Sequence, residues 1–247
     1  MDRPRPVPSG QAADVWWFDI RTAPHLPGYP AGLSAAERDR AAGLMSAGAR
    51  RRYQAAHVLL RQVLAGYLPA GPAELEFGRE PCPRCGRPSG RPVLAAAAGS
   101  AAPFPWFSLA HSGDAVVIAV AGRPVGVDAE QDPVRCVCPL AGAMHPADAA
   151  AMAGVAEPDR HRAIIRWWVR GEAALKCTGE GIAHRLGEFP VLTAAGALPA
   201  PADLAAPAGY QAALALAGAN GCPAVTLAAP PPGPGGPAAG SLGSEDR

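Results

Sequence analysis

The stretch Trp168–Gly181, with the sequence WVRGEAALKCTGEG, carries the most informative pattern of this chain. It forms the end of a predicted helix over about residues 158–178, which stops at Gly179 because glycine readily adopts the left-handed conformation that terminates helices. Lys176 is the only lysine of the protein and follows Glu172 by four residues. The two side chains therefore share a helix face, and a compact ammonium there suits a phosphate contact better than the planar fork of arginine. An ordinary surface lysine is the competing interpretation.

Two carboxylates lie upstream, in Gly126–Glu130 (GVDAE). Side chains alternate along a strand, so Asp128 and Glu130 lie on the same side of a strand predicted over residues 125–130. Two adjacent like charges are unfavourable unless a cation joins them, and carboxylate oxygens are ligands that Mg²⁺ prefers. The pattern indicates a cation site with Glu172 as third ligand, or alternatively a solvated strand edge.

Working outward, the order of predicted elements is strand, helices and strands, repeated once. This order favours an α+β fold of two similar halves, over residues 13–123 and 124–228, with the cation site in the second half. Residues 1–12 and 229–247 are rich in Pro, Gly, Ala and Ser and are expected to be disordered. Strands are expected at residues 14–20, 74–77, 106–110, 115–121, 125–130, 189–192, 210–217 and 224–227. Helices are expected after Ser34, over 49–67, after His145 and over 158–178.

Composition narrows the classes of function. The net charge of +1 gives no general argument for binding nucleic acid, and no apolar run approaches the length of a membrane span. We expect a cytoplasmic protein in which the six cysteines are thiols or metal ligands. Cys82 and Cys85 form a C-x-x-C loop that could hold zinc if Cys136 and Cys138 completed the four ligands, but a reduced loop is the default.

Three segments together resemble a known family. Phe107–Gly113 (FSLAHSG), Gly126–Glu130 and Trp168–Gly181 are similar, in order and spacing, to the three signature motifs of the Sfp-type 4′-phosphopantetheinyl transferases. The resemblance covers about residues 14–227. It implies a monomeric, pseudo-twofold α+β enzyme of the holo-[acyl-carrier-protein] synthase type, active in secondary metabolism. Such an enzyme moves 4′-phosphopantetheine from coenzyme A, bound between the halves, to a serine of an apo acyl or peptidyl carrier protein, and releases 3′,5′-ADP.

The resemblance also implies roles for individual residues. Asp128, Glu130 and Glu172 would hold Mg²⁺, while Lys176 and His111 would contact phosphates of the coenzyme. Either Glu172 or Asp148 would accept the proton of the carrier serine. Further phosphate contacts are expected from basic residues of the first half, namely Arg50, Arg52, Arg61 and, in a Gly-Arg-Pro segment, Arg91. The carrier is expected to dock on residues 145–166, through Arg160, Arg162 and Arg166 and part of the apolar set Met144, Met152, Ile164 and Ile165, with the isoleucines buried.

Two positions depart from the family pattern. Gly171 stands where a basic residue precedes the glutamate, and Ala110 stands where a serine precedes the histidine. These changes favour an alternative in which the protein is a catalytically idle module that binds coenzyme A or the carrier. A third hypothesis is a zinc-stabilised scaffold built on the Cys82–Cys85 loop.

Overall fold

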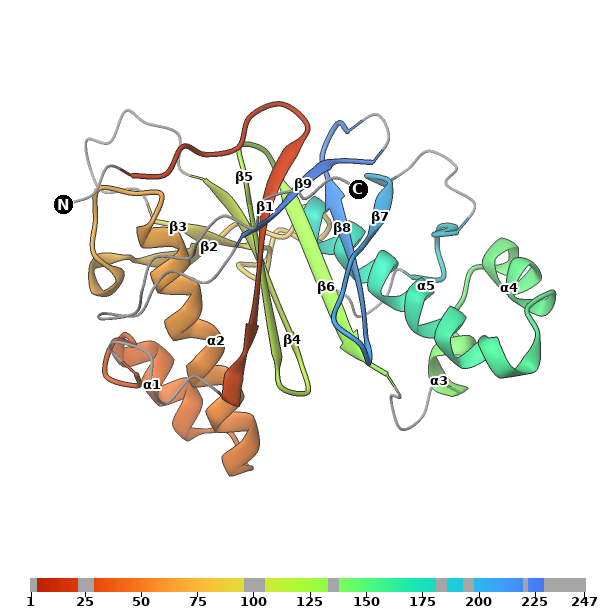
Figure 1. The fold of residues 1–247 in the computed structure, drawn as a ribbon, viewed down its shortest axis with the longest axis horizontal. Coiled ribbons are helices and arrows are strands. Elements are labelled where there is room, and N and C mark those ends of the chain that lie inside the picture. The colour runs from red at the N-terminus through yellow and green to blue at the C-terminus, as the bar shows by residue number, and fades with distance from the viewer. Residues whose placement is uncertain are drawn as a thin grey trace, which may run out of the picture.

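The computed structural model describes residues 4–21, 29–95, 105–132, 138–180, 186–192, 198–219 and 222–228. Two sheets and their helices form four layers, with helix α2 (Ala47–Ala65) on one outer side and helix α5 (Glu157–Thr178) on the other (Figure 1). The predicted α+β class is confirmed, while the pseudo-twofold relation of the halves stays a prediction.

The first sheet is four-stranded, in the order β4-β5-β1-β9. Its strands are β1 (Ala12–Asp19), β4 (Trp106–Ser112), β5 (Ala115–Ala121) and β9 (Ala224–Ala228). Strand β1 pairs antiparallel with β5 and parallel with β9. The C-terminal strand, expected within the second half, thus completes the sheet of the first.

Every residue of β5 is buried, because both faces of this strand are covered. Val116, Ile118 and Val120 share a cluster with the apolar face of α2, whereas the alternate residues pack toward the second sheet. A continuous apolar run is the pattern expected of such a doubly covered strand. Helix α1 (Ala35–Ala42), the 3₁₀ turn η2 (Pro72–Glu74) and the short hairpin of β2 (Phe77–Arg79) and β3 (Pro92–Leu94) complete this side.

The second sheet is three-stranded, in the order β6-β8-β7, and is antiparallel throughout. It consists of β6 (Val125–Gln131), β7 (Pro201–Leu204) and β8 (Tyr210–Leu216). Along β8, Ala213 and Ala215 face α5, while Leu214 and Leu216 face the first sheet. Helices α3 (Cys138–Ala141) and α4 (Pro146–Ala153) lie at the far end of α5 (Figure 1). Among the described residues, no helix is long and apolar enough to cross a membrane.

Some expected elements differ from the observed ones. Strands β3 and β7 were not predicted, because each begins with a proline, which lacks the N–H that a sheet interior requires. Both prolines are tolerated as first residues of a strand. Residues 189–192 form no strand, and the strand expected at 74–77 begins only at Phe77.

The N-terminal segment differs from the expectation that residues 1–12 are disordered. The Arg5 amide donates to the Gly66 carbonyl (2.8 Å), and the Gly122 amide donates to the Pro8 carbonyl (2.9 Å). The Arg5 guanidinium also lies 3.1 Å from the carboxylate of Asp14. These contacts hold residues 5–8 against the end of α2 and the end of β5. The proposed tail, residues 229–247, lies outside the described residues.

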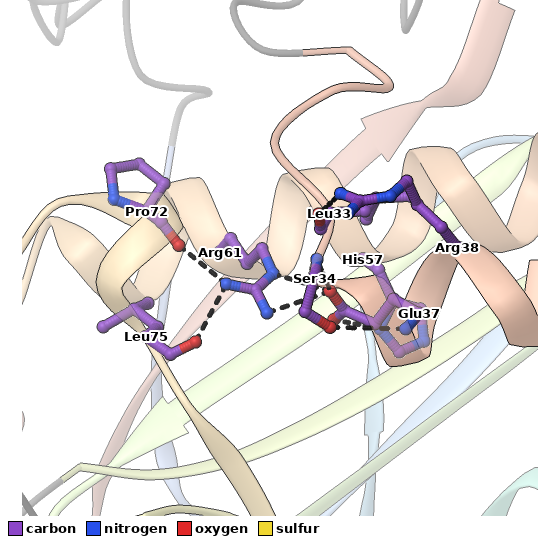
Figure 2. Close-up of polar contacts among 8 residues, drawn as sticks. All are labelled: Leu33, Ser34, Glu37, Arg38, His57, Arg61, Pro72 and Leu75. Carbon is purple, nitrogen blue, oxygen red and sulfur yellow. Dashed lines mark hydrogen bonds and ion pairs between the residues drawn. The ribbon is translucent and has the colours of Figure 1, made fainter.

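A buried ionic network joins α1 to α2 (Figure 2). Glu37 closes a capping box with Ser34 and accepts hydrogen bonds from Arg61 Nε (2.9 Å) and His57 Nδ1 (3.1 Å). Arg61 is 2% exposed and also donates to the carbonyls of Pro72 and Leu75 (2.9 Å each). Burial alone raises the pKa of Glu37, but bonds from His57, the Ser34 amide and Arg61 outweigh it and lower this pKa to about 2. A buried pair of this kind needs such full satisfaction to stabilise the fold.

Acidification should therefore weaken the fold through Glu37. Its pKa of about 2 lies below the ordinary value of 4.5, so its contribution is fully present above about pH 4.5 and is lost as the pH falls toward 2. A gap of this size corresponds to roughly 3 kcal/mol. Urea unfolding should show Glu37→Gln far less stable than the parent at pH 7 and closer to it at pH 3. The exposed Glu76→Gln variant is the control. If Glu37→Gln lowered the free energy of unfolding by the same amount at both pH values, the result would contradict the network.

Candidate functional site

The site begins with a close approach between α5 and β6. A Cβ atom at Gly126 would lie 1.9 Å from the Ala173 carbonyl oxygen and 2.5 Å from the Cys177 amide nitrogen, so only glycine fits there. The helix backbone consequently rests directly on the strand. Glu172 and Lys176, one turn apart on α5, are thereby placed over Asp128 on β6.

Lys176 joins three elements at the boundary between the two sheets. Its Nζ donates to Asp128 Oδ1 (2.7 Å), to the Val127 carbonyl (3.1 Å) and to the Leu109 carbonyl of β4 (3.5 Å). The side chain is 26% exposed, so it remains partly accessible to a ligand. The arrangement suits a compact, three-donor cation better than a planar guanidinium.

Three carboxylates surround this lysine, and they repel one another. Asp128 and Glu172 are buried, and Glu130 is partly exposed. Burial raises the pKa of each carboxyl group. The pKa of Glu172 rises to about 8, because burial and the charges of Asp128 and Glu130 outweigh the attraction of Lys176. One lysine cannot neutralise three carboxylates that lie in a largely buried site.

The same residues fit a cation chemically. Asp128 Oδ2 and Glu172 Oε1 are buried without a hydrogen-bond partner, which is unfavourable unless something absent from the chain itself meets them. Among the described residues, however, no group of three or more His, Cys, Asp or Glu side chains is arranged so that it could hold a metal ion by itself. A cation here would need ligands beyond these side chains. Mg²⁺ suits such a site, since this ion commonly keeps waters and phosphate oxygens among its ligands.

His111 and Arg52 lie beside the carboxylate group. His111 is the second-to-last residue of β4 and is exposed, but partial burial of its ring, followed by the charge of Lys176, lowers its pKa. Arg52 of α2 is close enough to lower it further. Arg50 is exposed and donates to the Leu44 carbonyl (3.4 Å). Arg52 thus presents positive charge beside His111 from the first half, as an anionic ligand requires.

Two predicted phosphate contacts have structural partners. Arg61 is enclosed in the Glu37 network. Arg91 is 15% exposed; it donates to Glu80 (2.6 Å) and to the Cys177 carbonyl of α5 (2.6 Å), and it stacks over Trp106 at 4.4 Å. Phosphate contacts of Arg61 and Arg91 stay predictions, and their observed bonds favour structural roles.

Asp148 is fully buried, away from solvent. Its carboxylate accepts hydrogen bonds from Trp167 Nε1 (2.9 Å) and from the amides of Val191 (2.7 Å) and Leu192 (2.9 Å). Three donors at such distances engage both of its oxygens, and none is left to face a substrate. The geometry favours an anchor for residues 191–192 over the catalytic role expected from the sequence.

Gly171 has a packing reason. A Cβ there would lie 2.2 Å from Leu186 Cδ2 and 3.5 Å from Val191 Cγ2. The segment anchored by Asp148 thus covers the helix at the place where the family pattern has a basic side chain. Arg170, the neighbouring cation, is bound to Asp203 of β7 (2.6 Å) and does not substitute for it.

The C-x-x-C loop lies apart from these groups in the contacts that the structure gives. Cys82 is buried and Cys85 is exposed. Cys136 and the side chain of Cys138 lie outside the described residues, so zinc binding at this loop stays a prediction.

Sequence comparison relates the chain to two cyanobacterial proteins, while no protein-family model matches it. It is 30% identical over 137 residues to the 4′-phosphopantetheinyl transferase HetI of Nostoc sp., which covers 54% of this chain and 54% of that protein. It is 28% identical over 175 residues to slr0495 of Synechocystis sp., provisionally named for the same activity, over 70% of this chain and 67% of that protein. The match with the first protein thus spans about half of its length.

The packing at Gly171 can be tested by filling the space. Gly171→Ala should lower the free energy of unfolding by about 1–3 kcal/mol, because overpacking against Leu186 outweighs the gain in helix propensity of up to about 1 kcal/mol. Gly48→Ala is the control in α2, since a Cβ there meets only Arg52 Nη1 at 3.4 Å. In a Leu186→Ala background the loss should shrink. An equal loss in both backgrounds would contradict this packing.

Proposed function

Since the chain is a relative of the 4′-phosphopantetheinyl transferases, as its motifs indicated, we propose that it transfers 4′-phosphopantetheine from coenzyme A to a serine of an apo carrier protein. The reaction depends on Mg²⁺ and releases 3′,5′-ADP. The observation that supports this proposal most directly is the group of three carboxylates around Lys176, with two buried, unpartnered oxygens.

The ligand set suits transfer from a pyrophosphate. Held by Asp128, Glu130 and Glu172, Mg²⁺ would neutralise charge on the pyrophosphate of coenzyme A. Phosphoryl-type transfer depends mainly on positioning and charge neutralisation, for which no elaborate covalent apparatus is needed. Lys176 would exchange its longest bond, to the Leu109 carbonyl (3.5 Å), for a bond to a phosphate oxygen. Arg52 would attract the remaining phosphates, and the ring of His111 would donate a hydrogen bond to them.

The carrier serine must lose a proton, and the chain offers Glu172 for this step. Its Oε1 has no hydrogen-bond partner, whereas both oxygens of Asp148 are engaged. We therefore assign proton acceptance to the ionised form of Glu172, which a bound cation would favour against the raised pKa of the free protein. Glu172 lies on the same helix face as Lys176. Asp148 supports the site from a distance by anchoring residues 191–192.

The carrier is proposed to meet residues 145–166. Ile164 and Ile165 are buried, as expected, and so is Met152, which leaves Met144 as the partly exposed apolar residue. Arg160 is paired with Glu157, and Arg166 with Asp203. Arg162 is exposed, and its guanidinium has no ion-pair partner among the described residues. Its charge is therefore the best placed to meet an acidic partner.

The central test is transfer itself. The protein is mixed with coenzyme A, Mg²⁺ and an apo carrier, and the mass of the carrier is measured. A gain of one phosphopantetheine group, abolished by EDTA and restored by Mg²⁺, is expected. Binding of coenzyme A without any gain in carrier mass would instead favour the idle binding module.

Lys176 offers the sharpest test of the site. Lys176→Ala should lower kcat/KM for transfer by about 10²-fold, the effect of losing one preorganised donor to a developing charge. Lys176→Arg should also lose activity, because the guanidinium does not fit the three acceptors of the ammonium. Arg123→Ala is the control, since it removes another cation that bonds a backbone carbonyl, that of Ala217. Full activity in both lysine variants would remove Lys176 from the site.

Asp128→Asn keeps the shape of the side chain and removes its charge. We expect the rate of transfer to fall by about 10²-fold at physiological Mg²⁺, because the cation loses a charged ligand. Circular dichroism should show an intact fold. Unchanged turnover would contradict the role of Asp128 in holding the cation.

Charge reversal tests the carrier surface. Arg162→Glu should raise KM for the carrier several-fold and leave KM for coenzyme A unchanged, since opposite charge at a binding rim affects only the partner that meets it. Arg40→Glu, an exposed reversal on α1, serves as the control. Equal effects on both constants would place Arg162 near the coenzyme instead.

A further inference from the structure

The two sheets meet along β4 and β6, and serine side chains bond the two strands together. Ser108 Oγ accepts a hydrogen bond from the Val127 amide (3.0 Å), and Ser112 Oγ accepts one from the Gln131 amide (3.1 Å). Both pairs are separated by nineteen residues, so the strands run parallel in one register. Hydroxyl oxygens here accept bonds that carbonyls accept in an ordinary sheet.

Ser112 makes one contact that Ser108 does not. Its Oγ lies 2.5 Å from Glu130 Oε2. A hydroxyl has a single hydrogen, and because the Gln131 amide occupies an acceptor position, that hydrogen is directed to the carboxylate. A donor to an ionised oxygen at this distance forms a strong hydrogen bond.

The surroundings keep Ser112 in place. The turn after it needs Gly113, whose φ is +55° and whose absent Cβ would lie 2.2 Å from Gln131 Oε1. The Asp114 amide donates to the hydroxyl of Tyr210 on β8 (3.2 Å). The end of β4 is therefore fixed against β6 and β8, and Ser112 has little freedom to leave Glu130.

Glu130 is also held from the other side. The side chain of Trp168 on α5 hydrogen-bonds it, as Ser112 does from β4. One proposed cation ligand is thus oriented by both halves of the molecule. Hydrogen bonds to a ligating carboxylate fix its orientation and support the affinity for the metal.

We propose that Ser112 is a positioning residue that orients Glu130 toward the cation and the pyrophosphate of coenzyme A. The inference rests on the proposed function, because it presumes that Glu130 is a ligand. Ser112 couples the first half of the chain to the ligand set of the second. The packing of β4 against β6 then also orients Glu130 in the cation site.

A merely structural role predicts something different. If Ser112 served only to join β4 to β6, its loss would resemble the loss of Ser108, which makes the equivalent bond without touching a carboxylate. Ser108→Ala is therefore the matched control. Ser112→Thr keeps the hydroxyl and should restore whatever Ser112→Ala loses.

The experiment measures Mn²⁺ binding by electron paramagnetic resonance, with coenzyme A present, in parent, Ser112→Ala, Ser112→Thr and Ser108→Ala proteins. Ser112→Ala should weaken Mn²⁺ binding about tenfold, the lower end of the effect of removing a group that orients a ligand. Ser112→Thr should return within about twofold of the parent. Ser108→Ala should lower the melting temperature while leaving Mn²⁺ affinity unchanged.

The outcomes separate this inference from the function on which it rests. A parent protein that binds no Mn²⁺ with coenzyme A would overturn both. Normal binding by the parent together with equal binding by Ser112→Ala would overturn the positioning role alone. Equal losses in Ser112→Ala and Ser108→Ala would assign both serines to the joining of the sheets. If Ser112→Ala does not fold, failure of Ser112→Thr to bind Mn²⁺ like the parent overturns the inference.

Discussion

The direct contact of α5 with β6 is the constraint on which the rest of the second half depends. Glycine at position 126 removes the Cβ that would otherwise strike the Ala173 carbonyl, so the helix backbone rests on the strand. The register of that contact sets Glu172 and Lys176 over Asp128. A spacing of one helical turn becomes functional only because the helix lies this close and in this orientation.

The electrostatics of the site follow from that closeness. Buried carboxylates repel one another, and Lys176 compensates only part of their charge. Such an arrangement sacrifices stability in the free protein, as functional sites often do. The buried network between α1 and α2 differs from this site. Glu37 and Arg61 meet each other and several further partners, and the contrast marks the carboxylate group as a place prepared for a ligand.

The two halves are joined by more than apolar packing. Lys176 bonds carbonyls of both β4 and β6, Ser112 connects β4 to Glu130, and Arg91 bonds the end of α5. The C-terminal strand β9 returns to the first sheet beside β1. A site at this boundary is therefore sensitive to both halves, which suits the reaction proposed for it.

Much of this followed from the sequence alone, since local signals are strong where one residue type is required. The capping box at Ser34, the helix end at Gly179, the apolar run of β5 and the alternation that puts Asp128 and Glu130 on one side all depend on neighbours in the chain. The three motifs likewise indicated a resemblance to the 4′-phosphopantetheinyl transferases, and the sequence comparisons found two similar proteins of that name. Strand β7 was not predicted because it contains Pro201, and a strand tolerates proline mainly as its first residue. Only the pairing with β8 shows that Pro201 is that first residue.

Tertiary structure decided what each polar side chain meets. The carboxylate of Asp148 could chemically serve as a general base. Its three hydrogen bonds instead make it an anchor for residues 191–192. By the family pattern, Gly171 lacks a basic side chain. In the structure, the absence of a side chain makes room for Leu186. The sequence showed Ser112 only as part of a motif, and the structure places it beside Glu130 of β6. Sequence determined which groups were available and their local spacing, whereas packing between segments far apart in the chain decided which of them are free to act, because burial and partners fix the charge and reach of a side chain.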